Sequence, residues 1–334
     1  MDENILSQHH VAPAAAHGSA RIAVVIPSYR VRAHILDVIE RIGPEVTAIY
    51  VVDAKCPDGS GEYVRERCAD PRVTVVFNAH NEGVGGATLN GFARAAEEGA
   101  DVIVKIDGDG QMDPALLSRF AAPILLGRAD FTKGNRFYNP EDVIAMPPVR
   151  LFGNAVLSFM SKLSTGYWHV FDPTNGYLAI DARVFRLLPR HKIARRYFFE
   201  TDLLFRLNTI RAVVRDIPMA AVYGDEVSHL HIRREVARFF AGHCRNFVKR
   251  LVYNYFVRDF GLASLQLVGG LIAIGGGGLF GALKWYENAA AGVDTPAGTV
   301  MIATLPIILG FQLLLSFLGY DIAAAPSDPL QARI

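Results

Sequence analysis

One acidic segment places oxygen-bearing side chains at alternate positions. Asp107, Asp109 and Gln111 come at the end of a short apolar run, Val102–Ile106. Two carboxylates and an amide oxygen with this spacing can converge on one divalent cation, and hard oxygen ligands suit Mg²⁺ or Mn²⁺. An ion held there could neutralise a diphosphate leaving group. The residues alone leave open a second interpretation, a solvated acidic turn that caps a helix beginning at Pro114.

Competing motifs fit this sequence poorly. A calcium loop beginning at Asp107 would need Gly at its sixth position and Glu at its twelfth, where the chain has Met112 and Ser118. Gly83–Gly86 resembles a phosphate-binding turn, but the first apolar run leads into Pro27 with no glycines, so the dinucleotide-binding fingerprint is missing. The sequence also contains no Walker loop, no HExxH and no G-x-S-x-G elbow.

Strand-like and helix-like segments alternate through the first two thirds of the chain. This alternation predicts an α/β fold, with a mainly parallel sheet that binds ligands at the carboxyl ends of its strands. The expected strands are Ile22–Ile26, Ala48–Val52, Val73–Phe77, Val102–Ile106, Ala129–Lys133, Asn175–Ile180 and Ala212–Ile217. The expected helices are Val31–Ile42, Gly85–Glu98, Pro114–Leu126, Val149–Leu163 and Tyr197–Ile210.

Two long apolar segments near the end predict a transmembrane hairpin. Leu262–Leu283 is 22 residues without a charge, and Ala297–Tyr320 is 24. Each exceeds the ~20 residues needed to cross the bilayer core. Seven Arg and Lys residues between Arg233 and Arg258 precede the first segment. By the positive-inside rule, the catalytic body and the short C-terminal tail are expected in the cytoplasm, and the loop 284–296 outside.

The basic segment before the hairpin also contains interleaved aromatic and aliphatic residues. This pattern, next to a membrane span, predicts an amphipathic helix lying in the interface plane, in preference to a nucleic-acid-binding helix. The near-neutral balance of 34 basic and 33 acidic residues agrees that nucleic acid is not a partner. Gly275–Gly278 and Gly281, inside the first span, allow close helix packing, within the hairpin or in a homo-oligomer.

The remaining composition indicates a reducing, cytoplasmic setting. Three cysteines without a CxxC pair argue against a disulfide framework or a structural zinc site. Residues 1–20 have no apolar core long enough for a secretory signal and are expected to form a disordered tail.

Seven short motifs in a fixed order make the chain resemble family 2 glycosyltransferases of the GT-A fold. More narrowly, it is similar to bacterial polyprenyl-phosphate glycosyltransferases and dolichol-phosphate mannose synthases, over roughly residues 20–320. The motifs are Val24–Tyr29, Val51–Asp53 with Asp58–Ser60, Asn78–Gly91, Asp107–Gln111, Gly134–Arg136, Asp172–Tyr177 and Glu200–Asp202.

This resemblance implies roles for individual residues. Asp53, Pro27 and Tyr29 would hold the nucleoside of the donor, and Asp107 its diphosphate. Asp107, Asp109 and Gln111 would share the metal, with Asp107 and Asp109 also counted as catalytic. Arg136 would hold the acceptor phosphate through bidentate hydrogen bonds, with Arg150 as a second candidate.

Glu200 and Asp202 fall on the family's acidic motif that faces the sugar. In enzymes with hydroxyl acceptors such a residue is the base, whereas a phosphate acceptor is already anionic and needs little help. Which of the two would act as a base stays open. Both Arg residues could instead be surface ion-pair partners, and Glu200 could cap its own helix.

Two departures from the family pattern affect nucleoside recognition. The usual Asn-Glu after Pro-x-Tyr is Arg30-Val31, and the usual second Asp of the Asp-Asp-Gly-Ser turn is Ala54. The metal motif is intact, but UDP-sugar and GDP-sugar donors stay equally open.

The sequence therefore predicts an inverting, metal-dependent glycosyltransferase, anchored in the inner membrane by a multi-pass hairpin. It would move a sugar from a nucleotide-sugar to polyprenyl phosphate at the cytoplasmic face. The alternatives are transfer to a sugar hydroxyl of a lipid-linked oligosaccharide and a catalytically silent scaffold of the same fold. The expected organisation is a tail (1–20), a GT-A domain (21–230), an amphipathic segment (231–260), the hairpin (261–322) and a cytoplasmic tail (323–334).

Overall fold

A computed structural model describes residues 20–138, 148–220 and 232–334, so the tail predicted over 1–20 lies almost wholly outside the described residues. Its core is a seven-stranded sheet with the strand order β3-β2-β1-β4-β6-β5-β7. The strands are β1 (Ile22–Ser28), β2 (Val46–Asp53), β3 (Val73–Phe77), β4 (Val102–Lys105), β5 (Phe131–Asn135), β6 (Leu178–Asp181) and β7 (Val214–Pro218). Only β6 runs antiparallel to its neighbours, so the predicted mainly parallel sheet is confirmed.

Helices cover both faces of this sheet, as the near-continuous burial of its central strands requires. One apolar core lies under α3 (Gly83–Glu97), α7 (Ala182–Leu187) and α8 (Phe199–Thr209). The other lies under α1 (Ile35–Glu40), α2 (Ser60–Arg67) and α4 (Leu117–Leu125). The short 3₁₀ helices are η1 (Pro114–Leu116), η2 (Arg190–Lys192) and η4 (Leu330–Arg333).

The sheet opens between β1 and β4, and this opening positions the site. Strand β1 pairs with β2 along its whole length but with β4 only from Ile22 to Val25. Pro27, which cannot donate a backbone hydrogen bond, lies beyond the shorter ladder. The chain order reverses here, with β2 on one side of β1 and β4 on the other. In open α/β sheets the crevice at such a switch point binds ligands.

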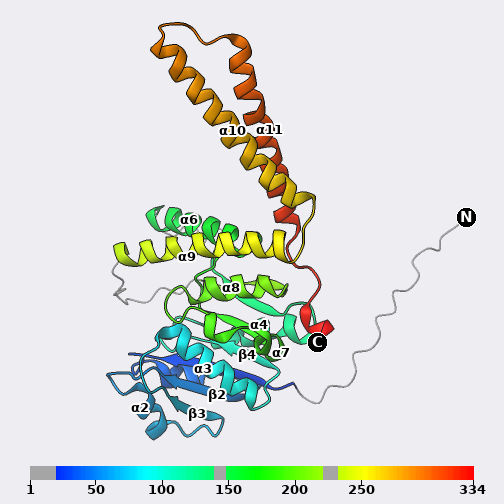
Figure 1. Cartoon of the computed structure of the whole chain (residues 1–334). Helices are drawn as coiled ribbons and strands as arrows, with labels where there is room; N and C mark the ends of the chain where they lie inside the picture. Colours follow the sequence, from blue (N-terminus) through cyan, green and yellow to red (C-terminus); the bar gives the residue numbers. More distant parts are fainter. Residues whose placement is uncertain (1–19, 139–147, 221–231) are drawn as a thin grey trace, which may run out of the picture.

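Two helices form a layer between the sheet and the C-terminal hairpin (Figure 1). They are α6 (Pro148–Thr165) and α9 (Ile232–Val252), which pack against each other. Along α9, every fourth residue of an exposed stripe is apolar or a cysteine, namely Val236, Phe240, Cys244, Val248 and Val252. The opposite stripe is polar and buried.

The buried stripe of α9 consists of three polar side chains that form hydrogen bonds with other elements of the protein. His243 Nδ1 lies 2.8 Å from the hydroxyl of Ser164, and the Asn246 amide donates to Asp202. Arg250, 1% exposed, donates to the carbonyl of Leu163. Helix α9 thus exposes an apolar stripe beside basic residues such as Arg245 and Lys249, and it buries polar side chains, whereas a soluble surface helix buries its apolar stripe. The predicted amphipathic helix is present with this inverted arrangement.

The C-terminal hairpin consists of α10 (Leu262–Ala290) and α11 (Ala297–Ala323), preceded by a π-helix, Tyr253–Val257. Both helices are long and apolar enough to cross a bilayer, and only 22% and 17% of their apolar windows are buried inside the protein. Such exposure does not suit core helices of a soluble domain. Helix α10 continues seven residues beyond the predicted end of the span, so half of the expected loop is helical.

The C-terminal end of the hairpin and the segment after it bind the rest of the protein. Asp321, in the last turn of α11, receives two hydrogen bonds from Arg250 of α9. The backbone N–H groups of Leu330 and Gln331 donate to the buried carboxylate of Asp130, just before β5. The segment 323–334, predicted as a cytoplasmic tail, is thus bound to the sheet domain through Leu330 and Gln331.

Candidate active site

The loop after β4 carries the predicted metal-binding residues into the opening of the sheet. Asp107, Asp109 and Gln111 are all half-buried, so ligands can reach them. The N–H of Gln111 donates to Asp109 Oδ1 at 3.0 Å and tightens the loop. Gly110 has φ +80°, a backbone conformation that costs a side-chain-bearing residue free energy. The loop geometry therefore depends on Gly110 as well as on the acidic residues.

A buried lysine lies directly beneath this loop. Lys105, the last residue of β4, is fully buried, and its ammonium donates to Asp107 Oδ1 at 2.6 Å and to the Gly176 carbonyl at 3.1 Å. A Cβ at Gly176 would lie 2.5 Å from Asp107 Oδ2, so only glycine allows this approach. Although burial lowers the pKa of Lys105, the nearby carboxylates of Asp107 and Glu200 raise it above its ordinary value.

A second buried lysine occupies the same row of the sheet. Lys133 of β5 and Lys105 of β4 both pair in register with Leu178 of β6, which separates them by two strand spacings, about 10 Å. The Lys133 ammonium donates to the carbonyl of Asn175. Burial lowers the pKa of Lys133 to about 8, and the carboxylates of Glu200 and Asp172 offset part of that effect.

Glu200, in the first turn of α8, completes this group of charges. Burial raises the pKa of the Glu200 carboxyl, and the ammonium groups of Lys105 and Lys133 offset part of the rise. Asp107 adds a smaller repulsion in the same direction as burial. Glu200 is therefore a carboxyl group within electrostatic reach of the predicted metal ligands, and its proton affinity is higher than that of an exposed glutamate.

Asp202 lies two residues further along α8 and is fully buried. Its Oδ2 accepts from the backbone N–H of Ala194 at 2.9 Å, and its Oδ1 accepts from the amide of Asn246 at 2.9 Å. Both carboxylate oxygens are thus used to join α8 to a loop and to α9. Of the two predicted acidic candidates, the fold places Glu200 beside the metal loop and Asp202 in the structural interior.

Arg136, just after β5, is held by a bidentate ion pair. Its Nε and Nη2 donate to the two oxygens of the nearly buried Asp172, at 2.7 and 3.0 Å. Asp172 also accepts from Asn175, whose carbonyl binds Lys133. The segment Asp172–Gly176 therefore connects the arginine to both buried lysines. Arg150 lies in the first turn of α6, but its side chain is outside the described part of the structure.

The residues predicted to hold the donor nucleoside lie on the neighbouring strands. Pro27 is near the end of β1, and Tyr29 follows it with 42% of its surface exposed. Asp53 ends β2 in register with Ser28. The Asp53 carboxylate is buried and accepts from the N–H groups of Cys56 and Gly61, each at 2.8 Å. These bonds fix the turn after β2 where the chain departs from the family pattern.

The donor set after β4 fits a magnesium or manganese ion. Among the described residues, no three His, Cys, Asp or Glu side chains gather as a metal site. The predicted set has two carboxylates and an amide, and Mg²⁺ is commonly held by one or two carboxylates together with substrate phosphates. Asp107 is 30% exposed, and Lys105 binds only its Oδ1. Such a site would be completed by the substrate.

Sequence reasoning did not identify the two lysines or Asp172 as site residues. Lysines in strands are usually expected at exposed positions, and nothing local distinguishes Lys105 and Lys133. A signal was nevertheless available. Lys105 is the only charged residue in an otherwise apolar strand whose end carries Asp107, and a buried cation beside carboxylates is the arrangement that burial tolerates.

Comparison with known proteins identifies the family of this chain. Residues 23–188 match the model of glycosyl transferase family 2. A polyprenol monophosphomannose synthase of Mycolicibacterium smegmatis is 31% identical over 213 residues, which are 62% of this chain and 79% of that protein. The chain belongs to glycosyl transferase family 2. It is a glycosyltransferase, and the predicted family is confirmed.

Two further relatives have similar coverage. An undecaprenyl-phosphate mannosyltransferase of Micrococcus luteus is 29% identical, over 60% of this chain and 84% of the relative. A UDP-N-acetylglucosamine–dolichyl-phosphate N-acetylglucosaminyltransferase of Methanococcus voltae is 27% identical, over 60% of this chain and 86% of the relative. These relatives use different sugars, so family membership does not identify the donor of this chain.

Solved structures confirm the fold. The glucosyl-3-phosphoglycerate synthase of Mycobacterium tuberculosis, in complex with Mn²⁺, UDP and glucosyl-3-phosphoglycerate, has a TM-score of 0.51 at 18% identity, covering 69% of this chain and 80% of that chain. The mannosyl-3-phosphoglycerate synthase of Rubrobacter xylanophilus has a TM-score of 0.54 at 18% identity, covering 72% and 77%. The predicted GT-A architecture is thereby confirmed.

Proposed function

We propose that this glycosyltransferase moves a sugar from a nucleotide-sugar to a polyprenyl phosphate, with inversion at the anomeric carbon. The observation that carries the proposal is the connected arrangement of the metal loop and Arg136. Asp107 binds Lys105, Lys105 binds the Gly176 carbonyl, and the same segment holds Arg136 through Asp172. Relatives named for dolichyl-phosphate and undecaprenyl-phosphate acceptors support this choice of acceptor.

Asp107, Asp109 and Gln111 would hold Mg²⁺ or Mn²⁺ at the donor diphosphate. When bound, the ion would supply positive charge to the departing nucleoside diphosphate. Lys105 would fix the position of Asp107, because its buried ammonium donates a hydrogen bond to Asp107 Oδ1. Pro27, Tyr29 and Asp53, at the carboxyl ends of β1 and β2, remain the proposed wall of the nucleoside site.

Arg136 is proposed to bind the acceptor phosphate. Asp172 engages two of its nitrogens, which fixes the plane of the guanidinium. The Arg136 side chain is 28% exposed, so a phosphate can approach it. A phosphate oxygen is already anionic and can attack without a base. Because no base is needed, Glu200 is proposed to orient the sugar or to balance the charge of the two buried lysines. Asp202 is proposed to hold α8 in place through its bonds to Ala194 and Asn246.

The hairpin and the layer of α6 and α9 support a proposed membrane location. We propose that α10 and α11 span the inner membrane and that the catalytic body lies at its cytoplasmic face. The exposed apolar stripe of α9 has a counterpart on α6 in Phe152, Val156 and Phe159. Basic residues such as Arg245 and Lys249 are exposed on α9 as well. Asp321 at the end of α11 binds Arg250 of α9, the helix that precedes the hairpin, so both ends of the hairpin lie on one side of the proposed bilayer, which supports the topology expected from the positive-inside rule.

The proposal is tested with membranes that contain the full chain, undecaprenyl phosphate and a panel of labelled UDP- and GDP-sugars. One donor is expected to give a single labelled, lipid-extractable product that mild acid releases as the monosaccharide. Asp109→Ala should lower its formation at least ~1,000-fold, because the charge sink for the leaving group is lost. Its membrane insertion should be unchanged.

Two results would contradict the proposal. Label found only in an elongated glycan would indicate a sugar-hydroxyl acceptor instead, with Glu200 as the base. Full activity of Asp109→Ala, or full activity in the presence of EDTA, would remove the metal assignment.

A further inference from the structure

A polar hollow of about 240 Å³ lies at the base of the hairpin, away from the active site. It is enclosed by the ends of α6, α8 and α11 and by the π-helix after α9. Arg211, on its wall, precedes the amino end of β7, whereas Asp107 and Arg136 follow the carboxyl ends of β4 and β5. Strands β4 and β5 are both antiparallel to β6, and β7 is parallel to β5, so the hollow and the active site lie toward opposite ends of the strands.

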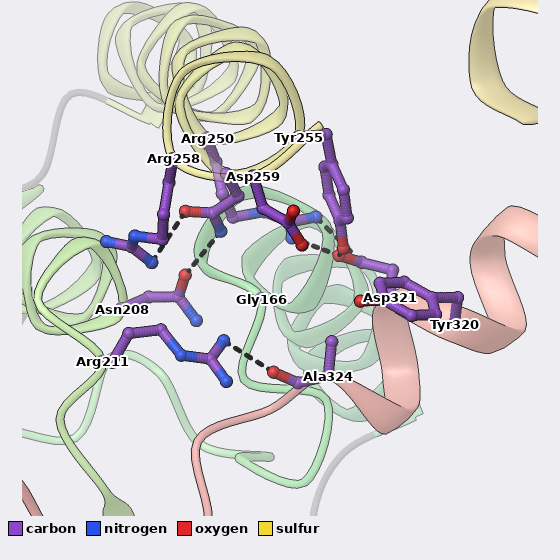
Figure 2. Close-up of a pocket in the computed structure, with 11 residues that line it drawn as sticks. Gly166, Asn208, Arg211, Arg250, Tyr255, Arg258, Asp259, Tyr320, Asp321 and Ala324 are labelled. Atoms are coloured by element: carbon purple, nitrogen blue, oxygen red, sulfur yellow. Dashed lines mark hydrogen bonds and ion pairs between the residues drawn. The ribbon is translucent and has the colours of Figure 1, made fainter. Parts of the chain in front are cut away.

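The hollow presents charges of both signs. Figure 2 shows the guanidinium groups of Arg211 and Arg258 on one side, with Asn208 between them. Asp259 lies across from them, is exposed, and forms no ion pair within the ranges that the structure describes. Arg250 does not add to the available charge, because Asp321 and the Leu163 carbonyl occupy its guanidinium.

Arg211 and Arg258 are exposed, and each has N–H groups that donate no hydrogen bond to the described residues. Arg211 uses Nη1 to bind the Ala324 carbonyl at 2.7 Å, leaving Nε and Nη2 without a hydrogen bond to the described residues. Arg258 uses its two Nη atoms for Asn254 and the Thr209 carbonyl, leaving Nε. Arg211 also has φ +64°, a conformation rare for residues with a side chain. The backbone thus holds this arginine at the hollow despite a conformational cost.

A second hollow, of about 200 Å³, continues the first toward the membrane. The two share Tyr255, Asp259 and Tyr320 as lining residues. The second is also lined by Leu262 and Ala263 at the start of α10. Tyrosines at the headgroup level and an apolar extension along the hairpin are features of a site for an amphiphile.

We propose that this pair of hollows binds one bilayer phospholipid whose headgroup carries a phosphate and a primary ammonium. The phosphate is held by Arg211 and Arg258, and the ammonium by Asp259. The acyl chains leave along the base of α10. A purely anionic headgroup would leave Asp259 facing a negative charge, and a quaternary ammonium could not donate a hydrogen bond to it. The bound lipid would fix the hairpin against the catalytic body, independently of the transfer reaction.

Native mass spectrometry of the full chain in detergent tests the site, with dioleoyl phosphatidylethanolamine, phosphatidylglycerol and phosphatidylcholine as probes. The expected result is retention of one phosphatidylethanolamine at least about tenfold tighter than either other lipid, since hydrogen bonds to charged groups differ between them. Arg258→Gln should weaken its retention about tenfold. Asp259→Asn should remove the preference while phosphate-dependent retention persists.

Arg333→Gln is the matched control, because it removes an exposed arginine elsewhere in the C-terminal segment, and it should change nothing. Arg211→Gln repeats the test in case Arg258→Gln fails to fold, which thermal unfolding reveals. Equal retention of all three lipids by the wild type, retention unaffected by both arginine variants, or binding of inorganic phosphate that displaces the lipid would overturn the proposal. Each variant should keep its affinity for the donor nucleotide, so loss of the lipid site is separable from loss of the transferase site.

Discussion

At the scale of single residues, the two buried lysines show how the hydrogen-bond partner of an ammonium group changes its pKa. Lys105 has a carboxylate at 2.6 Å, and its pKa rises, whereas Lys133 binds only a carbonyl, and its pKa falls to about 8. Both are fully buried, so the difference arises from the partner and not from the burial. Together the two ammonium groups place buried positive charge close to the carboxyl groups of Asp107 and Glu200.

The ion pair between Asp172 and Arg136 leads to a prediction about the acceptor. In Asp172→Asn the carboxylate that fixes the guanidinium plane is lost, so Arg136 samples other rotamers. We expect the KM for polyprenyl phosphate to rise about tenfold while the KM for the donor stays within about twofold, since charged hydrogen bonds contribute ~1.5–3 kcal/mol. Steady-state kinetics with each substrate varied in turn measures this.

Asp328→Asn makes the same chemical change in an exposed pair with Arg333, and it should alter neither KM. If Asp172→Asn raised both KM values equally, or left the acceptor KM unchanged, Arg136 would not be the phosphate ligand that we propose.

At the scale of elements, α8 and α9 each divide their residues between two tasks. Residues two apart on a helix point in different directions, so Glu200 lies within electrostatic reach of Lys105 and Asp107, whereas Asp202 is buried against α9. Helix α9 buries His243, Asn246 and Arg250 and leaves its apolar stripe outside. This inverted arrangement suits a helix that has protein on one side and lipid on the other.

The buried histidine of α9 should make this docking pH-dependent. Burial lowers the pKa of His243 to about 4, from about 6.5 in the unfolded chain. Between these values the unfolded chain binds a proton that the folded chain does not, so stability decreases as pH falls from 6.5 toward 4. The decrease is roughly 3 kcal/mol in total and roughly 2 kcal/mol by pH 5.

Thermal unfolding of the purified protein at pH 7, 6 and 5 checks the sign and the size of this effect. His243→Gln keeps a polar side chain beside Ser164 but cannot titrate, so its melting temperature should fall less on acidification. An equal pH slope in the two proteins would show that another group is responsible.

At the scale of the whole molecule, the hairpin is joined to the body by one buried network. Asp321 of α11 accepts from Arg250, from Tyr255 at 2.5 Å and from the indole of Trp168 at 2.9 Å. The carboxylate thereby collects donors from α9, from the π-helix and from the segment after α6. The C-terminal segment bound at Asp130 adds a second attachment. The membrane part and the catalytic part are therefore expected to move together.

Breaking this network should separate the two parts. Asp321→Asn leaves the Arg250 guanidinium buried without a charged partner, which typically costs ~3–5 kcal/mol. We expect faster trypsin cleavage between α9 and α10 and a lower melting temperature of the body, with membrane insertion retained. The double variant Arg250→Met with Asp321→Leu should recover most of the stability, because no unpaired charge remains. Unchanged cleavage in Asp321→Asn would show that the C-terminal attachment suffices.

Much of this architecture was predictable from local patterns. The apolar run Val73–Phe77 is a strand with the bounds that the pattern predicts, and the charge-free segments are the two long helices. Boundaries were less accurate where caps decide them: Val31–Ile42 shortens to Ile35–Glu40. Helix α2 (Ser60–Arg67) was missed, because its eight mostly polar residues carry little apolar periodicity.

The sequence by itself determined the order of the strands β1 to β7, the acidic loop after β4 and the apolar hairpin, because periodicity and side-chain chemistry are local properties. Only the tertiary structure decided that Lys105 and Lys133 lie in one row, that Glu200 lies within electrostatic reach of Asp107 while Asp202 binds Ala194 and Asn246, and that Asp321 accepts hydrogen bonds from Arg250. Those outcomes depend on which strands pair, in which register, and on which side of a helix meets another element. Such relations join residues far apart in the chain, and no short window of sequence contains them.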